Sequence, residues 1–350
     1  MLSFLAVRNF DGRCESHAVK SIVKAETVAR YFAALMLIAF AGMTTAQVAS
    51  QDATAWLHRM SQASRTMNYS GLFVYRSGGR TESSRITHVV DGSGQQERLE
   101  TVDGASREVI RNNDEVQTFF PKERLLVIDR AVAGSFPGRA VSVVSGLSDF
   151  YVVRLGDTER VAGRDAQSIR LEPRDDMRYG HELWADAATG LLIKARMLRA
   201  PGDVVEEFAF SDLLVGPQVD RERVKPRYSR TADWTILNAR GIDLRAEEFG
   251  WVFRGLPPGF KQVSLARRPI RKDGPEALHA VFSDGLATIS VFIEPSNGRN
   301  MSVAPVQSHS GPIGIYKSSK GDVMVTAIGE VPPAALRRVA ESVEKQTPKP

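Results

Sequence analysis

The sequence predicts a mostly β protein of the α+β class, with a curved antiparallel sheet over a helix and a smaller C-terminal β domain that ends in a helix. Three observations lead to this prediction: helical apolar spacing near residues 53–67, a change to a two-residue period from Tyr69 onward, and a length of 350 residues. That length exceeds the roughly 250 to 300 residues that one core supports, so two domains are expected.

The first 46 residues have the pattern of a signal peptide with a long basic leader. Lys20, Lys24 and Arg30 precede an uncharged apolar run, residues 31–41, and small residues follow it. The run is too short for a membrane-spanning helix, which needs roughly 20 residues. Cleavage near Ala46 is expected, which places the mature chain in the periplasm. Cys14 precedes the run, so the mature chain would contain no cysteine.

Residues 47–215 form the predicted first domain. Its helix, at 53–67, places Trp56, Leu57, Met60, Ala63 and Met67 on one apolar stripe. Eleven short segments rich in β-branched and aromatic residues follow, separated by Gly and Asp turns. They are expected at 70–76, 84–90, 95–102, 106–111, 115–120, 124–129, 150–156, 167–172, 179–185, 191–199 and 204–214. Eleven strands after a helix favour an open or nearly closed sheet wrapped over that helix.

Residues 216–231 are the predicted linker, because they contain two prolines and a run of basic residues without apolar periodicity. The second domain, 232–350, has six expected strands and a final helix at 332–345, which begins at Pro332 and Pro333. The strands are expected near 260–266, 277–283, 286–293, 300–307, 312–317 and 322–328.

The composition excludes several classes of protein. Hydrophobic residues at 43% and charged residues at 25% are typical of a globular chain, and a net charge of +5 is small for a nucleic-acid binder. The chain lacks the G-x-S-x-G, H-x-x-x-H, C-x-x-C, G-x-G-x-x-G and Walker patterns, and its histidines are scattered. The neighbouring acids Glu206-Glu207 and Asp175-Asp176 are not expected to act as catalytic pairs. We therefore predict a binding protein with no catalytic residue, no metal and no cofactor.

Several strings resemble the RseB/MucB family of periplasmic regulators of the sigma-E (AlgU) envelope stress response. The resemblance covers nearly the whole mature chain in the same order. It rests on 56–60 (WLHRM), 68–75 (NYSGLFVY), 107–113 (REVIRNN), 173–175 (PRD), 178–180 (RYG), 183–186 (LWAD), 189–192 (TGLL), 256–260 (LPPGF), 282–285 (FSDG) and 329–332 (GEVP).

The resemblance implies a fold and a role. The first domain should be an unclosed barrel like the lipoprotein carriers LolA and LolB, which senses lipid or lipoprotein. The second should bind an anti-sigma factor. Family members bind the periplasmic segment of a transmembrane anti-sigma factor of the RseA or MucA type and shield it from site-1 proteolysis. Lipopolysaccharide or mislocalised lipoprotein is thought to release them.

Two sets of side chains are candidates for binding. A curved sheet facing a helix could leave a concave apolar surface for acyl chains; the alternative is an ordinary aromatic core. The candidate lipid-binding residues are Phe73, Tyr75, Phe119, Phe120, Phe150, Tyr151 and Trp184. Basic residues of the linker and of the second domain could meet lipid phosphates or an acidic partner segment; the alternative is a solvated surface. The candidate partner-binding residues are Arg227, Arg230, Arg267, Arg268, Arg271 and Lys272.

A second function, a periplasmic carrier of lipoproteins or acyl chains, would need only the first domain. A third, an envelope hydrolase, lacks a motif. A homodimer or higher oligomer stays open at this point.

Overall fold

The computed structural model describes residues 52–131, 146–271, 274–296, 306–310 and 312–346. The predicted signal peptide and its cleavage site lie outside these ranges. The described residues all belong to one compact unit that begins at Ala49. Among them, no helix has the length and apolar character needed to cross a membrane.

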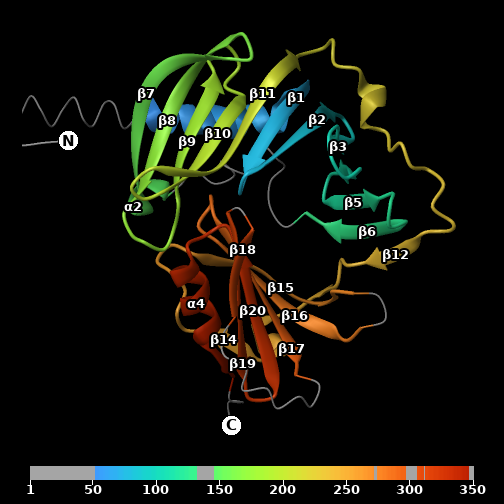
Figure 1. The fold of residues 1–350 in the computed structure, drawn as a ribbon, viewed down its shortest axis with the longest axis vertical. Helices are drawn as coiled ribbons and strands as arrows, with labels where there is room; N and C mark the ends of the chain where they lie inside the picture. Colours follow the sequence, from blue (N-terminus) through green and yellow to red (C-terminus); the bar gives the residue numbers. More distant parts are fainter. Residues whose placement is uncertain (1–51, 132–145, 272–273, 297–305, 311, 347–350) are drawn as a thin grey trace, which may run out of the picture. The chain divides into compact units, whose positions relative to one another are not determined.

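The first domain consists of a helix, residues 52–66, and one large sheet (Figure 1). The strands are β1 (Tyr69–Ser77), β2 (Arg80–Asp91), β3 (Gly94–Thr101), β4 (Glu108–Asn112), β5 (Glu115–Phe120), β6 (Leu125–Arg130), β7 (Tyr151–Val161), β8 (Arg164–Pro173), β9 (Gly180–Asp186), β10 (Leu192–Arg199), β11 (Asp203–Val215) and β12 (Thr235–Asn238); the short helix α2 (Leu147–Phe150) precedes β7. The order is β12-β6-β5-β4-β3-β2-β1-β11-β10-β9-β8-β7. The two end strands do not pair, so the predicted unclosed, mostly β fold is confirmed.

The helix at 52–66 packs its apolar stripe on the half of the sheet formed by β7 to β11. Leu57, Met60 and Ala63 are buried in the same core as Ile169 and Leu183. At the helix end, the side-chain oxygen of Asn68 accepts the amide of Val90, and the Asn68 carbonyl accepts the amide of Gly216. These bonds fix where the chain passes from helix to β1.

The predicted linker lies against the first domain. It contains the short 3-10 helix η2 (Arg221–Val224), and Val219 and Val224 are buried with Val89. The backbone amide of Arg227 donates to both carboxylate oxygens of Glu108, each at 3.1 Å. Beyond the linker, β12 pairs in parallel with β6, so the chain adds a strand to the first sheet before it enters the second.

The second sheet has the order β13-β15-β16-β17-β20-β19-β18. The elements here are β13 (Ile242–Asp243), α3 (Ala246–Phe249), β14 (Trp251–Phe253), β15 (Lys261–Pro269), β16 (Glu276–Ser283), β17 (Thr288–Pro295), β18 (Val306–Ser310), β19 (Ile313–Lys320), β20 (Val323–Gly329), α4 (Pro333–Glu341) and β21 (Val343–Lys345). Helix α4 buries Leu336 and Val339 in a second core with Phe282 and Val325.

The predicted helix at 332–345 is too long. It ends at Glu341, and Val343–Lys345 forms a strand that pairs with β14. The Lys320 ammonium group explains the stop, because it donates to the carbonyl oxygens of Glu341 and, at 2.9 Å, of Val343. A cation there stabilises the negative end of the helix and satisfies its free carbonyls.

Candidate binding surfaces

The seven candidate aromatic residues lie in two places, five of them in or against the first core. Phe73 and Trp184 belong to the first core, and Tyr75 packs against it. The Phe73 ring meets the rings of Phe208 and Phe210 edge to face, at centroid distances of 6.1 and 5.9 Å. These contacts are typical of a packed interior.

Two members of the first group also have polar neighbours. The Tyr75 hydroxyl donates to the Glu206 carboxylate at 2.7 Å. Burial raises the pKa of Glu206 to about 7, and the nearby Glu330 carboxylate adds to the effect. Trp184 is fully buried, and the Lys194 ammonium group lies 3.9 Å from the centroid of its ring.

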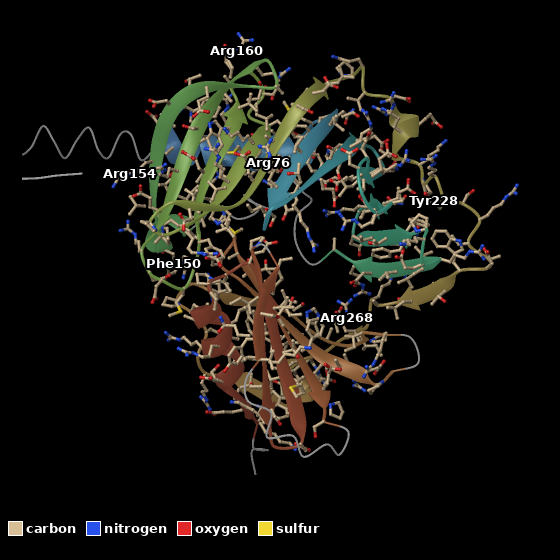
Figure 2. All side chains as sticks on the ribbon, viewed as in Figure 1. Arg76, Phe150, Arg154, Arg160, Tyr228 and Arg268 are labelled. Atoms are coloured by element: carbon tan, nitrogen blue, oxygen red, sulfur yellow. The ribbon has the colours of Figure 1, made fainter. Side chains whose placement is uncertain are left out.

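Phe119 and Phe120 lie elsewhere, on β5. Phe119 is buried against Tyr228 of the linker (Figure 2) and Trp234, with both ring centroids at 6.1 Å. Phe120 is partly exposed. Tyr151 also belongs to the first core, and Phe150 packs against it at the side where Gly259 of the second domain approaches. The structure therefore does not bring the seven rings together around one space.

The six candidate basic residues also differ from one another. Arg227, Arg230, Arg267 and Arg271 are exposed, and Lys272 lies outside the described residues. Arg268 (Figure 2) is only 13% exposed, because its guanidinium forms an ion pair at 2.5 Å with Asp129 of β6. Arg268 therefore joins the second sheet to the first.

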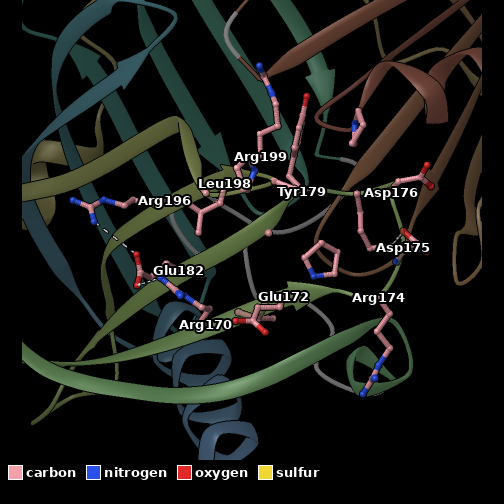
Figure 3. Close-up of a pocket in the computed structure, with 18 of the residues that line it drawn as sticks. Arg170, Glu172, Arg174, Asp175, Asp176, Tyr179, Glu182, Arg196, Leu198 and Arg199 are labelled. Atoms are coloured by element: carbon pink, nitrogen blue, oxygen red, sulfur yellow. Dashed lines mark hydrogen bonds and ion pairs between the residues drawn. The ribbon is translucent and has the colours of Figure 1, made fainter. Parts of the chain in front are cut away.

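A groove of about 790 Å³ lies between the β8, β9 and β10 strand ends and the start of α4 (Figure 3). Its lining includes none of the seven candidate aromatic residues and none of the six candidate basic ones. Its lining is Arg170, Leu171, Glu172, Pro173, Arg174, Asp175, Asp176, Arg178, Tyr179, Gly180, Glu182, Arg196, Leu198, Arg199, Ala200, Pro201, Gly202, Val204, Pro332 and Pro333.

 This groove combines a charged floor with an apolar wall.

The floor of the groove is a cross-strand ladder of alternating charge. Glu182 of β9 accepts from Arg170 of β8 at 3.3 Å and pairs with Arg196 of β10 at 3.7 Å. Arg196 also binds Glu207 of β11 at 2.6 Å. The dashed lines in Figure 3 mark the contacts of Glu182. These charges therefore compensate one another within the first sheet.

At one end of the groove, a buried clamp joins the two domains. Arg178, from the turn between β8 and β9, donates to the Asp284 carboxylate at 2.6 Å and to the Pro258 carbonyl at 2.5 Å. The side chains of Arg178 and Asp284 are both 0% exposed. On its own side of the boundary, the guanidinium also donates to Asp175 at 3.0 Å. We call Arg178, Asp284 and Tyr151 the domain clamp.

Aromatic rings surround this ion pair. The Arg178 guanidinium carbon lies 5.0, 5.5 and 5.4 Å from the ring centroids of Phe150, Tyr151 and Phe260. The Tyr151 hydroxyl donates to Asp284 at 3.3 Å. The other Asp284 oxygen accepts two backbone amides of the turn between β16 and β17, which fixes the carboxylate in place. The rings exclude water and so strengthen the ion pair.

Sequence reasoning missed the clamp as a site. Arg178 and Asp284 both lie in strings that carry the family resemblance, 178–180 and 282–285. They are 106 residues apart, and nothing in either string says that they meet. Arg178 does not stand out in its own turn, because that turn also contains Arg174, Asp175 and Asp176.

A second buried polar group crosses the first sheet. Tyr69, His88, Glu97 and Arg111 are direct partners on four neighbouring strands, β1 to β4. The Tyr69 and His88 rings stack at 4.9 Å, and the first three residues are buried. Within the described residues, the Tyr69 hydroxyl, His88 Nε2 and Glu97 Oε2 have no hydrogen-bond partner. Burial raises the pKa of Glu97 to about 8 and lowers the pKa of His88.

Among the described residues, no group of three or more His, Cys, Asp or Glu side chains could hold a metal ion. His181, close to the clamp, is buried, and burial lowers its pKa to about 4. It is therefore neutral at physiological pH.

Family models and known proteins match this chain over most of its length. The MucB/RseB N-terminal domain matches residues 52–228, and the MucB/RseB C-terminal domain matches residues 245–344. The sigma factor AlgU regulatory protein MucB of Pseudomonas aeruginosa is 33% identical over 319 residues, which covers 89% of this chain and 97% of that protein. The sigma-E factor regulatory protein RseB of Escherichia coli is 27% identical over 293 residues, 83% of this chain and 90% of that protein.

Solved structures agree with these matches. A chain of the Pseudomonas aeruginosa MucA/MucB complex superposes on this chain with a TM-score of 0.68 at 31% identity. The superposition covers 85% of this chain and 100% of that chain. MucB in complex with MucA(peri) gives a TM-score of 0.65 at 30% identity, with 85% of this chain and 100% of that chain covered. The predicted family resemblance is thereby confirmed. This chain belongs to the MucB/RseB family.

Proposed function

We propose that this protein is a periplasmic regulator that binds the periplasmic segment of a transmembrane anti-sigma factor of the MucA/RseA type. One observation carries the proposal: both domains match a MucB that was solved together with MucA, at 31% identity and a TM-score of 0.68. The relatives are named regulatory proteins, and binding alone is sufficient for such a role. Binding lowers the concentration of the free segment, and a protease that acts on the free segment then cuts it more slowly.

The basic residues of the second domain are the proposed partner contacts. Arg267 and Arg271 are exposed on and just after β15, whereas Arg268 is engaged with Asp129. Exposed guanidinium groups can bind carboxylates of a partner segment in a forked geometry. Arg227 and Arg230 extend the proposed basic surface along the linker.

Co-purification tests this proposal directly. The mature chain, residues 47–350, is mixed with the periplasmic segment of the anti-sigma factor from the same genome, and the dissociation constant is measured. We expect a stable complex, and we expect Arg267→Glu with Arg271→Glu to weaken it by at least roughly tenfold. Lys261→Glu is the control for each single replacement, because it reverses one positive charge at the other, exposed end of β15. No complex at micromolar concentrations of both proteins would refute the proposal.

Protection and release are the finer parts of the proposed function. The bound segment should be cut more slowly by a site-1 protease, and lipopolysaccharide or an acylated lipoprotein should restore cutting. Release requires that the lipid binds the free protein more tightly than the complex. In the first domain, Phe73, Tyr75 and Trp184 are the proposed acyl contacts, and a lipid would have to displace rings that now pack together. Transfer of a lipoprotein between membranes, without any effect on the segment, would favour the carrier function instead.

A further inference from the structure

We propose that Arg178 is a positioning residue. Through the domain clamp it fixes the position of the second domain relative to the first, and this position sets the width of the groove beside it. The inference concerns the protein alone and does not depend on which partner it binds. It rests on the position of the clamp, on its burial and on the two walls of the groove.

The clamp grips two separate turns of the second domain. Asp284 lies between β16 and β17, and Pro258 precedes β15. A single guanidinium therefore holds both turns, and each of its nitrogens has an acceptor. Five donors in a rigid plane make arginine suited to this task, and a lysine could satisfy only a part of it.

Close packing around the clamp leaves little freedom. An added Cβ at Gly259 would fall 2.4 Å from the Phe150 ring, so the second domain's turn touches the first domain's aromatic residue directly. This approach requires a glycine, which also has a φ of 82° there. The turn cannot slide past Phe150 without breaking the contacts of Arg178.

The groove takes one wall from each domain. Asp175, Arg178 and Tyr179 line it from the turn between β8 and β9, while Pro332 and Pro333 line it from the start of α4. The second domain carries α4 on the same sheet whose β16 to β17 turn the clamp holds. Any movement of that domain about the clamp must widen or narrow the groove. The affinity for a ligand that touches both walls therefore depends on the relative position of the two domains.

Beside the clamp, Leu286 packs against the first core and Met177 against the second. Further ion pairs between the domains lie at the far end of the first sheet. Arg268 pairs with Asp129, and Arg130 pairs with Asp243 at 2.9 Å. The second pair is largely exposed, with side chains 50% and 73% accessible, and contributes little. Loss of the clamp would leave the packing of Leu286, the pairing of β12 and the ion pairs of Arg240 and Arg268. The second domain could turn about these remaining contacts.

Distance measurement between two spin labels tests the inference. The mature chain has no cysteine of its own, so Asp157→Cys on β7 and Lys317→Cys on β19 accept labels at two exposed positions. Pulsed electron paramagnetic resonance should give one narrow distance distribution for the otherwise unchanged protein. Arg178→Gln should broaden or shift it, and Arg178→Lys should have a smaller effect.

Matched variants separate positioning from a general loss of stability. Arg170→Gln removes another arginine of the groove, but one that pairs within the first domain, and should leave the distribution unchanged. Tyr151→Phe deletes only one bond to Asp284 and keeps the ring, so it reports on the clamp even if Arg178→Gln does not fold. Adding Asp284→Asn to Arg178→Gln should cause no further broadening, because both act on one contact.

Two outcomes decide the matter. A broadened or shifted distance distribution in Arg178→Gln supports the inference if the circular dichroism spectrum of the chain is unchanged. A distribution identical to that of the unchanged protein, in folded Arg178→Gln or in folded Tyr151→Phe and Arg178→Lys together, overturns it. Failure of the anti-sigma segment to bind would leave this readout unaffected, so the two proposals fail separately.

Discussion

Glu97→Gln should stabilise the first domain in alkaline solution. The carboxyl group of Glu97 is 7% exposed, one of its oxygens has no hydrogen-bond partner within the described residues, and burial raises its pKa to about 8. The folded protein therefore keeps a proton on Glu97 at neutral pH, whereas the unfolded chain releases it near the ordinary value of 4.5. Glutamine has the same shape as this neutral carboxyl group and cannot ionise.

The size of the effect follows from proton linkage. Between pH 4.5 and about 8, the folded state binds one proton more than the unfolded state, so stability falls with rising pH. Each pH unit removes about 1.4 kcal/mol, and the whole interval on the order of 5 kcal/mol. The stabilising contribution of the protonated group is complete below pH 4.5 and lost as the pH rises through 8.

Urea denaturation of the mature chain at several pH values between 5 and 9 measures this difference. We expect Glu97→Gln and the unchanged protein to have similar unfolding free energies at the acidic end and to separate by several kcal/mol at the alkaline end. Glu100→Gln is the control, because Glu100 lies on the same strand, on the opposite face, in an ion pair with Arg98 at 2.7 Å. Parallel pH profiles for Glu97→Gln and the unchanged protein would refute the reasoning.

Three further changes have defined outcomes. Gly71→Ala should cost about 1 to 3 kcal/mol in thermal unfolding, because its Cβ would fall 2.5 Å from a backbone oxygen of β11. Asp186→Asn should lower the free energy of unfolding in urea by about 2 to 3 kcal/mol, since it loses the forked bonds from Arg164 at 2.8 and 3.1 Å. Because the pKa of Asp186 is lowered, this stabilisation is present at neutral pH and is lost in acid. Tyr75→Phe should raise the pKa of Glu206 above about 7 in a nuclear magnetic resonance titration, because the hydroxyl hydrogen bond now lowers it.

Local patterns were enough to predict most of the elements. The stripe of Leu57, Met60 and Ala63 forms the buried face of the helix at 52–66, and turns such as 201–203 separate strands where expected. Period and turn chemistry are properties of neighbouring residues, so a single sequence contains them. The predicted range of the final helix is too long, because the end of the helix depends on Lys320, a residue of another element, β19.

Contacts between distant segments could not be predicted in this way. Six of the seven aromatic residues lie on strands as predicted, whereas Phe150 ends the short helix α2 and does not begin a strand. The sheet face and neighbours of each ring depend on register, so Phe119 lies beside the linker and Phe150 beside Arg178. The sequence around Arg268 predicts an exposed charge in a basic cluster. In the structure, Arg268 binds Asp129, which is 139 residues away in the sequence. The groove likewise takes residues from both domains, and no continuous stretch of sequence describes it.

The path of the chain between the domains has a consequence for cleavage. The linker is fastened to Glu108 by the Arg227 amide before β12 returns to pair with β6, and Arg240 then binds Glu115. A protease that nicks the backbone once near residue 230 would therefore leave two pieces that still interlock through a shared sheet. They should migrate as one particle in native gel filtration and separate only in denaturant, as the halves of a complemented protein do.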